Sequence, residues 1–342
     1  MATGISLSHR VFVQKESTFG TIPNSSGAST VANADYMKAT RCVVNAAQGE
    51  IPDRDKNPSG DLTEGTPGPK SGNWSIVFEA RPRGTSAGRP DWAEILESAL
   101  EADGAVNGSN YDFSIGAVPT IKSFSLFQYR GTTLASQLAF GCVTNNLKLV
   151  MEQGANARFE ASGPALWVRD SVTWATDSGI GLGGYTAGAQ AAFPTEPGSP
   201  VANGIPVNAM TGSATLDGNT TVQIKSAAVN IAPGYEIPQD RLFAGQFGSN
   251  AERDVRRVTI DLAIVDEDIA AVTNLYSKAR SRTKIAITLE CGSTTNNRLQ
   301  VYAASCLLPE PQYTDDARKW AANLSGIICY ISSAADFRVR AY

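Results

Sequence analysis

Hydrophobic and polar residues alternate along much of this chain, which is the period-two pattern of strands that bury one face. Residues 74–79 place Trp, Ile and Phe on one face, and residues 284–290 alternate in the same way. Similar stretches predict further strands at about 6–14, 38–46, 121–130, 138–151, 156–162, 221–231, 257–265, 298–307 and 323–332. We therefore expect a mainly β fold.

Two segments break the alternation and have the period of a helix. In residues 91–102 the apolar side chains fall on one stripe, and Gly104 can end the helix. In residues 266–280 the acids come first and the bases last, an order that complements the helix dipole. Each predicted helix follows a strand and precedes several more, so one helix accompanies each group of strands.

One stretch of the sequence occurs twice. Residues 44–54 return as residues 229–241, with an offset of 185 between Asn45 and Asn230 and of 186 between Ile51 and Ile237. Each copy is followed by a long polar segment, then a strand and a helix. An internal repeat of this kind predicts a duplicated structural unit.

The repeat predicts two tandem β-sandwich or barrel modules, each with one flanking α-helix and a long protruding loop. We place the first module at residues 1–170 and the second at 214–342. Residues 171–213, rich in Gly, Pro and Ala, then form a linker or a decorated loop. Such modules leave unpaired sheet edges, and a closed oligomer is one way to satisfy them.

Composition narrows the class of protein. The chain has 342 residues, 42% hydrophobic and 18% charged, and a formal net charge of −4. This balance is typical of a globular protein and excludes a strongly basic nucleic-acid binder. No apolar run approaches the roughly 20 residues of a membrane span, and the N-terminus lacks the features of a secretory signal. The five cysteines are expected to be reduced core residues formed in a cytosolic compartment.

Candidate chemistry is scarce. His9 is the single histidine, which excludes a histidine-based triad or a multi-histidine metal site within one chain. Residues 179–184 are glycine-rich but lack the Lys-Ser/Thr of a phosphate loop, so a linker is the better interpretation. We predict no catalytic residues, no cofactor and no metal. The enzymatic alternative is a carbohydrate-active β protein whose paired acids are not evident from sequence.

Three features of the sequence carry a resemblance to a known family. They are residues 14–21 (QKESTFGT), the long loop after Glu50-Ile51-Pro52, and the strand–helix–strand order over residues 74–130. In these features the chain resembles the tail tube (major tail) proteins of long-tailed bacteriophages. A different virion structural protein, such as a head decoration or an adhesin-type β protein, is the alternative, and it would not need the paired long loops.

The resemblance implies a virion protein made in the host bacterial cytoplasm, with no membrane partner. Its subunits would stack as rings around a channel for DNA and the tape-measure protein, with tail terminator and tail-tip proteins at the ends. Most family members carry one domain and form hexameric rings. Because this chain carries two, we favour a trimer with pseudo-sixfold symmetry over a hexamer.

The resemblance also implies roles for individual residues. The two long loops become candidate inter-ring contacts, through Glu50, Ile51, Pro52, Asp53, Arg54, Asp61, Glu64, Glu236, Ile237, Pro238, Asp240 and Arg241. A conduit should not hold DNA, and a basic lumen would bind its phosphates. Strand alternation then offers three acids as candidates for the lumen: Glu79, Asp261 and Glu290.

Overall fold

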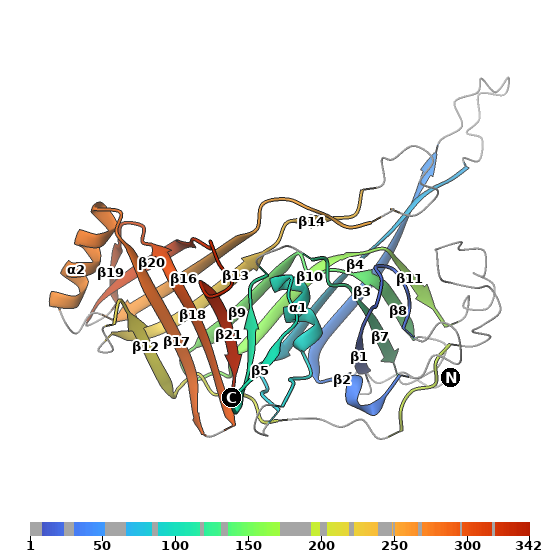
Figure 1. The fold of residues 1–342 in the computed structure, drawn as a ribbon, viewed down its shortest axis with the longest axis horizontal. Helices are drawn as coiled ribbons and strands as arrows, with labels where there is room; N and C mark the ends of the chain where they lie inside the picture. Colours follow the sequence, from blue (N-terminus) through green and yellow to red (C-terminus); the bar gives the residue numbers. More distant parts are fainter. Residues whose placement is uncertain are drawn as a thin grey trace.

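The computed structural model describes most of the chain, in residues 9–23, 31–51, 66–83, 88–116, 120–130, 136–171, 193–198, 204–218, 222–238, 248, 250–265, 269–294, 296–316 and 319–342. The described residues form β-sheet with two α-helices, which confirms the predicted mainly β class (Figure 1). The first half of the chain lies at one end of an elongated molecule and the second half at the other, with α2 at the far tip.

The elements of the first half are β1 (His9–Lys15), a 3-10 turn (Asn33–Asp35), β2 (Tyr36–Met37), β3 (Ala39–Ile51), β4 (Thr66–Glu79), α1 (Ala93–Leu100), β5 (Ala105–Asn107), β6 (Asn110–Ser114), β7 (Phe124–Arg130), β8 (Gln137–Cys142), β9 (Asn146–Glu152), β10 (Arg158–Ala165) and β11 (Trp167–Asp170).

The elements of the second half are β12 (Gly212–Leu216), β13 (Gln223–Ala232), β14 (Tyr235–Glu236), β15 (Glu252–Arg253), β16 (Arg257–Val265), α2 (Ile269–Arg280), β17 (Lys284–Thr294), β18 (Asn297–Leu307), β19 (Gln312–Asp316), β20 (Lys319–Cys329) and β21 (Phe337–Ala341).

A single run of antiparallel strands passes through both halves. Its order is β3-β4-β10-β9-β13-β16-β20, and we call it the long sheet. On the remaining side of β20, β19 pairs with the beginning of the strand, and the end of β18 pairs with Ile328 and Cys329, so the sheet continues there into the next layer. A second layer packs against it. That layer is β11-β8-β7-β1-β2 in the first half and β12-β17-β18-β21-β6-β5 in the second. The halves are therefore joined where β9 pairs with β13.

The pairing scheme of the first half recurs in the second. The long-sheet order β3-β4-β10-β9 is matched by β13-β16-β20-β19, and the second-layer order β11-β8-β7-β1 by β21-β18-β17-β12. Each helix lies between the matched strands, α1 after β4 and α2 after β16. The strand order thus repeats in the same sequence direction.

Irregularities recur with the strands. The β3–β4 pairing slips between Ala39 and Arg41, and the β13–β16 pairing slips between Ile224 and Ser226. The β7–β8 pairing slips after Phe124, opposite Cys142, and the β17–β18 pairing slips after Ile285, opposite Cys306. A β-bulge redirects a strand and its side chains, so a bulge at the same place in both halves preserves the same bend.

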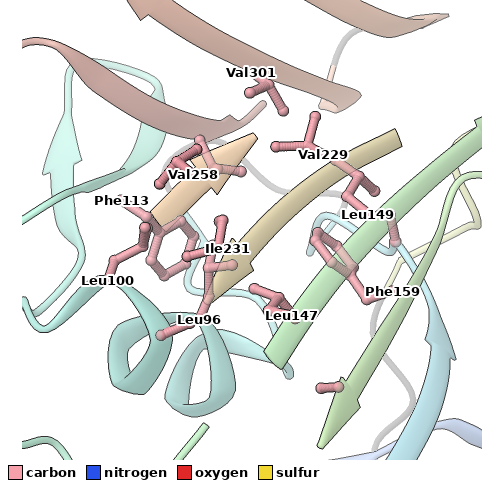
Figure 2. Close-up of a cluster of buried hydrophobic side chains, with 14 of the residues drawn as sticks. Leu96, Leu100, Phe113, Leu147, Leu149, Phe159, Val229, Ile231, Val258 and Val301 are labelled. Atoms are coloured by element: carbon pink, nitrogen blue, oxygen red, sulfur yellow. The ribbon is translucent and has the colours of Figure 1, made fainter. Parts of the chain in front are cut away.

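The core lies between the two layers. Figure 2 shows Leu96 and Leu100 of α1 against Ile231, and Val301 of β18 facing Val229 of β13 across the layers. Aromatic rings fill the first half, where the Trp92 ring lies 5.1 Å from that of Phe159 and 5.4 Å from that of Phe113 (Figure 2 labels both phenylalanines). In the second half Ile260, Ile287, Leu324 and Ile327 are fully buried instead.

A short hairpin fastens the halves together a second time. The β5–β6 hairpin lies between α1 and β7, and it pairs with β21 at the other end of the chain (Figure 1). Nη2 and Nε of Arg340 donate to both carboxylate oxygens of Asp112, at 2.7 and 2.5 Å. Bidentate pairs of this kind are among the stronger polar contacts in proteins. Between α2 and β17 only residues 281–283 intervene, so the second half has no such hairpin.

Several sequence-based expectations are wrong in detail. The sequence Asp-Gly-Asn at residues 217–219 predicts the turn of a hairpin, but β12 pairs with β17 and not with β13. The predicted strand at 138–151 is two strands, since Gly141 (φ 61°) and the turn after Cys142 carry the chain from one layer to the other. Residues 338–342, which the sequence predicts as a terminal tail, are mostly β21. The polar segment that follows the first copy of the repeat is predicted as a loop over residues 47–72, but both of its ends are strand.

Candidate assembly surfaces

One face of the long sheet points away from the core and carries mostly polar residues. The alternation that buries Phe159, Leu149 and Ile260 turns their strand neighbours outward. This outward face is hollowed where the halves meet, by a 260 Å³ groove. The groove is lined by residues of β9, β13, β16 and β20, among them Lys148, Glu152, Ser226, Asp261, Asn323 and Ser325.

Two of the three predicted lumen acids lie on this outward face. Glu79, at the end of β4, accepts a hydrogen bond from Asn156 (2.9 Å) and pairs with Arg81. Asp261, on β16, accepts from the Gly326 N–H (2.6 Å) and from Asn230 Nδ2 (3.1 Å). Because Gly326 lies at φ 73° within a register shift of β20, Asp261 also holds that bulge in place.

The third acid lies elsewhere. Glu290 is on β17, in the second layer, where it accepts hydrogen bonds from Arg298 (3.1 Å) and Gln300 (3.0 Å) of β18. Strand alternation alone separates the two faces of a strand but does not tell which layer the strand belongs to. The structure therefore brings Glu79 and Asp261 to one surface and leaves Glu290 on another.

Charges of both signs share the outward face. Arg158 of β10 donates to Glu160 (3.1 Å) and Glu152 (3.2 Å), and Lys148 and Glu160 are opposite each other on β9 and β10. Pairing of this kind leaves little uncompensated charge of either sign. Such a surface does not offer the unpaired row of cations that phosphate binding needs.

The long sheet has two outer strands. β3 pairs with β4, and β19 pairs with β20; within the described residues no strand pairs with the remaining side of either. Exposed side chains follow the β3 edge, including Arg41, Asn45, Ala47 and Gln48. Unpaired backbone donors and acceptors along such an edge are ready to bind another strand.

The β3–β4 hairpin projects well beyond the body of the molecule (Figure 1). Pairing continues as far as Glu50 opposite Pro67 and Ile51 opposite Thr66. The predicted contacts Glu50 and Ile51 therefore lie at the outer end of a strand. Pro52, Asp53, Arg54, Asp61 and Glu64, and in the second loop Asp240 and Arg241, fall outside the described residues.

The second long loop, after β13, lies on the first half of the same chain. Tyr235 donates its backbone N–H to the Asn145 side chain (2.7 Å) and its hydroxyl to Glu101 (2.9 Å). Together with Ala251, Tyr235 covers the buried Val143. Of the predicted loop contacts, Ile237 packs half-buried against this cluster, Pro238 is half-buried, and Glu236 is exposed. For Ile237 the contact is thus within the chain.

Glu101 is the centre of this contact. Its side chain is 0% exposed and forms ion pairs with Arg256 (2.5 Å) and Arg253 (3.1 Å), both from the second half. Burial lowers the pKa of Arg256, against the opposite effect of Glu101. Burial and the Glu101 carboxylate raise the pKa of Tyr235, which keeps its hydroxyl a donor. The sequence analysis did not single out Glu101; the signal available was an acid just past the end of a helix.

Other reactive groups are held in the core. All five cysteines are buried and free, and burial raises the pKa of Cys42 and of Cys291 to about 12. Burial also lowers the pKa of His9, which keeps its imidazole neutral. The described part of the chain contains no group of three or more His, Cys, Asp or Glu side chains placed to hold a metal ion.

Comparison with protein families settles the class. The family model described as phage tail tube protein matches residues 6–326, which is nearly the whole chain. The chain belongs to the phage tail tube protein family. The resemblance noted from sequence is thereby confirmed, and the protein is a structural component of the phage tail in the virion. A separate comparison with curated proteins found no match. Among the described helices, neither is long and apolar enough to cross a membrane.

Family membership gives the surfaces a context. A subunit of a tail tube must bind copies of itself, and the described residues include two unpaired strand edges and a projecting hairpin. The match favours the tail over the alternative of a head decoration or adhesin.

Proposed function

We propose that three copies of this chain close into a ring by pairing β19 of each copy with β3 of the next. The observation that carries the proposal is the junction inside the chain, where β9 pairs with β13 over six residues. By strand order β19 corresponds to β9 and β3 corresponds to β13. The two unpaired edges, on β19 and β3, therefore correspond to the two edges that already pair within the chain, on β9 and β13. Two such units per chain and three chains give pseudo-sixfold symmetry, as two tandem modules would require.

The register of the β9–β13 pairing within the chain also predicts the register of the proposed β19–β3 pairing between chains. Leu149 is opposite Val229 and Glu152 is opposite Ser226. Matched bulges and pairings make Tyr313 and Asp316 the counterparts of Leu149 and Glu152, and Val44 and Arg41 the counterparts of Val229 and Ser226. The ring should therefore place Asp316 opposite Arg41 of the next copy, which is a favourable pair of opposite charges.

The hollowed face of the long sheet then lines a channel. Joined end to end, three long sheets make one continuous sheet whose outward face surrounds the axis, with Glu79 and Asp261 repeated around it. Paired charges on that face suit a conduit through which DNA and the tape-measure protein pass without binding. Stacked rings form the tube, and terminator and tip proteins complete its ends. Glu290 belongs to the outside of this tube.

Cysteine cross-linking tests the ring directly. In the variant Arg41→Cys with Asp316→Cys, paired strands place the two Cα atoms about 5 Å apart, within reach of a disulfide. Oxidised tubes should give bands up to three chains on a denaturing gel. The single variants are matched controls and should stay monomeric, because the native cysteines are buried. A ladder that reaches six chains would contradict the trimer, and the absence of any ladder from assembled tubes would contradict the β3–β19 pairing.

A further inference from the structure

The helices of the two halves end in the same way but with opposite charge. Glu101 after α1 and Arg282 after α2 both have left-handed backbone, with φ of 61° and 54°. The same bond closes each end, from Ala102 N–H to Glu97 O (3.3 Å) and from Thr283 N–H to Lys278 O (2.9 Å). This is the six-residue closing bond of a Schellman motif. Glu101 and Arg282 therefore occupy equivalent positions.

The position in the first half is covered. As described above, the loop that carries β14 supplies Tyr235, Arg253 and Arg256 to Glu101. Tyr235 and Ala251 of the same segment reduce Val143 to 0% exposure. The contact therefore pairs an acidic residue at the end of α1, Glu101, with two basic residues of the loop that carries β14, Arg253 and Arg256.

The equivalent position in the second half, at Arg282, is exposed. We call Arg282, Lys284, Ile328 and Tyr330 the α2-cap patch. Arg282 and Lys284 are exposed, and Ile328 and Tyr330 retain 48% and 40% of their surface. The four lie together, because Lys284, Leu307 and Ile328 are neighbours on β17, β18 and β20, and Lys284 Nζ lies 4.3 Å from the Tyr330 ring. Leu307, which takes the place of Val143, is only half-buried.

Building on the proposed ring, we propose that the α2-cap patch binds the β3–β4 hairpin of a second copy. The hairpin corresponds to the loop that carries β14, and both extend from their own half in the same direction (Figure 1). The β14 loop reaches the first half of its own chain, so the hairpin reaches the second half of the next chain. Residues 49–66 hold five acids and two bases, a net charge of −3 that complements Arg282 and Lys284.

The charge of the patch agrees with the order of halves that the proposed β3–β19 pairing imposes on the ring. The first half of a neighbour offers the acidic hairpin no such site, because the β14 loop of that chain already covers Glu101 with Arg253 and Arg256. Placed on the second half, it meets Arg282. Each hairpin thus selects a second half over a first half, and specificity of this kind is a difference between the two affinities. First and second halves then alternate around the ring.

A photo-cross-linker at an exposed position of the patch tests the contact. Tyr330 is replaced by p-benzoylphenylalanine, and tubes are assembled from a mixture of isotope-labelled and unlabelled chains. We expect cross-linked peptides that join position 330 of one chain to residues 39–79 of another. Cross-links from assembled tubes to any other segment, or none at all, would overturn the contact while leaving the ring intact. Failure of the unmodified protein to form rings would instead overturn the ring proposal on which the contact rests.

Charge reversal gives an independent measurement. Arg282→Glu with Lys284→Glu should weaken association between chains roughly tenfold at low salt, with partial recovery at high salt as the repulsion is screened. Lys38→Glu with Arg83→Glu changes the charge equally at exposed first-half positions and should leave association unchanged. Equal effects of the two double variants, or none from the first, would contradict the proposal. Circular dichroism of both variants should match the unmodified chain.

Discussion

Among the described residues, the end of α1 and the β9 edge of the first half are covered within the chain, whereas the matching helix end and the β19 edge of the second half are not. In the first half the end of α1 is covered by a loop and β9 is paired with a further strand. In the second half the matching helix end is exposed and β19 has no described neighbour beyond β20. Two units with the same strand order therefore differ in what covers them. The surfaces of the first half that the chain itself covers therefore identify the matching surfaces of the second half that a second chain has to cover.

The largest effect should come from Glu101. In Glu101→Ala the cations Arg253 and Arg256 remain partly buried without their partner, and breaking a buried pair costs about 3–5 kcal/mol. We expect a loss of that size in the free energy of unfolding, measured by urea denaturation, and faster amide exchange at Tyr235. Arg282→Ala, at the equivalent exposed position, should change the free energy of unfolding of the monomer by about 0.5 kcal/mol or less. Similar losses in the two variants would show that the halves do not differ as described.

The β5–β6 hairpin should have the next largest effect. Asp112→Asn removes the charge that binds Arg340 bidentately, and loss of a charged hydrogen bond costs about 1.5–3 kcal/mol. Burial raises the pKa of Asp112, but hydrogen bonds from Arg340 and Asn107 outweigh it, so the pKa lies below 3.8.

The sign of this pKa shift predicts a pH dependence. A carboxyl whose pKa is lowered by folding stabilises the folded state above its unfolded pKa, and that stability is lost as the pH falls through the folded value. The difference in unfolding free energy between the unmodified chain and Asp112→Asn should therefore shrink below about pH 4. A constant difference down to pH 2 would argue against the ion pair as its cause.

Asp261 of β16 and Ser75 of β4 occupy matching positions in the two halves, and substitutions there should differ by a smaller amount in the free energy of unfolding. In Asp261→Asn, the bonds from Gly326 and Asn230 lose their charged acceptor, at a cost of about 1–2 kcal/mol. Ser75→Ala, at the matching place on β4, should change unfolding free energy by about 0.5 kcal/mol or less because β10 has no bulge there to hold. Thermal unfolding of the two variants measures the difference. Equal losses would mean that Asp261 does not support the β20 bulge.

The smallest effect concerns the thiols. Cys142 and Cys306 stand at matching positions of β8 and β18, and both are fully buried. Buried, protonated thiols react slowly because the thiolate is the reactive form. We expect no cysteine to react with Ellman's reagent in the folded protein and all five to react in denaturant. Rapid labelling of one thiol would identify a half that opens more readily than the other.

Sequence reasoning found the features that repeat along the chain. Alternation located most strands, an apolar stripe located α1, and the order of acidic and basic residues located α2. The repeat at Asn45 and Asn230 located the matched strands β3 and β13. These signals depend only on residues that are close together in the sequence, so they can be recognised without knowing which strands pair. The class of protein followed from their order, and the family match bore it out.

The sequence could not show which strands become neighbours across long separations. The sequence predicts a terminal tail at residues 338–342, yet Val339 of β21 is buried between β18 and β6. Glu290 looked like Asp261 because both interrupt an apolar alternation, and only pairing places them in different layers. Glu101 escaped notice because its partners Tyr235, Arg253 and Arg256 lie more than 130 positions away.

The β5–β6 hairpin has a consequence for how such a protein can change. It is present in one copy of the repeat and binds the other, so the two copies are not interchangeable. A substitution at Arg340 leaves Asp112 without its bidentate partner, although 228 positions separate the two residues. The copies are thereby bound to a shared evolutionary history, and a shorter ancestor that assembled from single copies could not be recovered by simply dividing this chain.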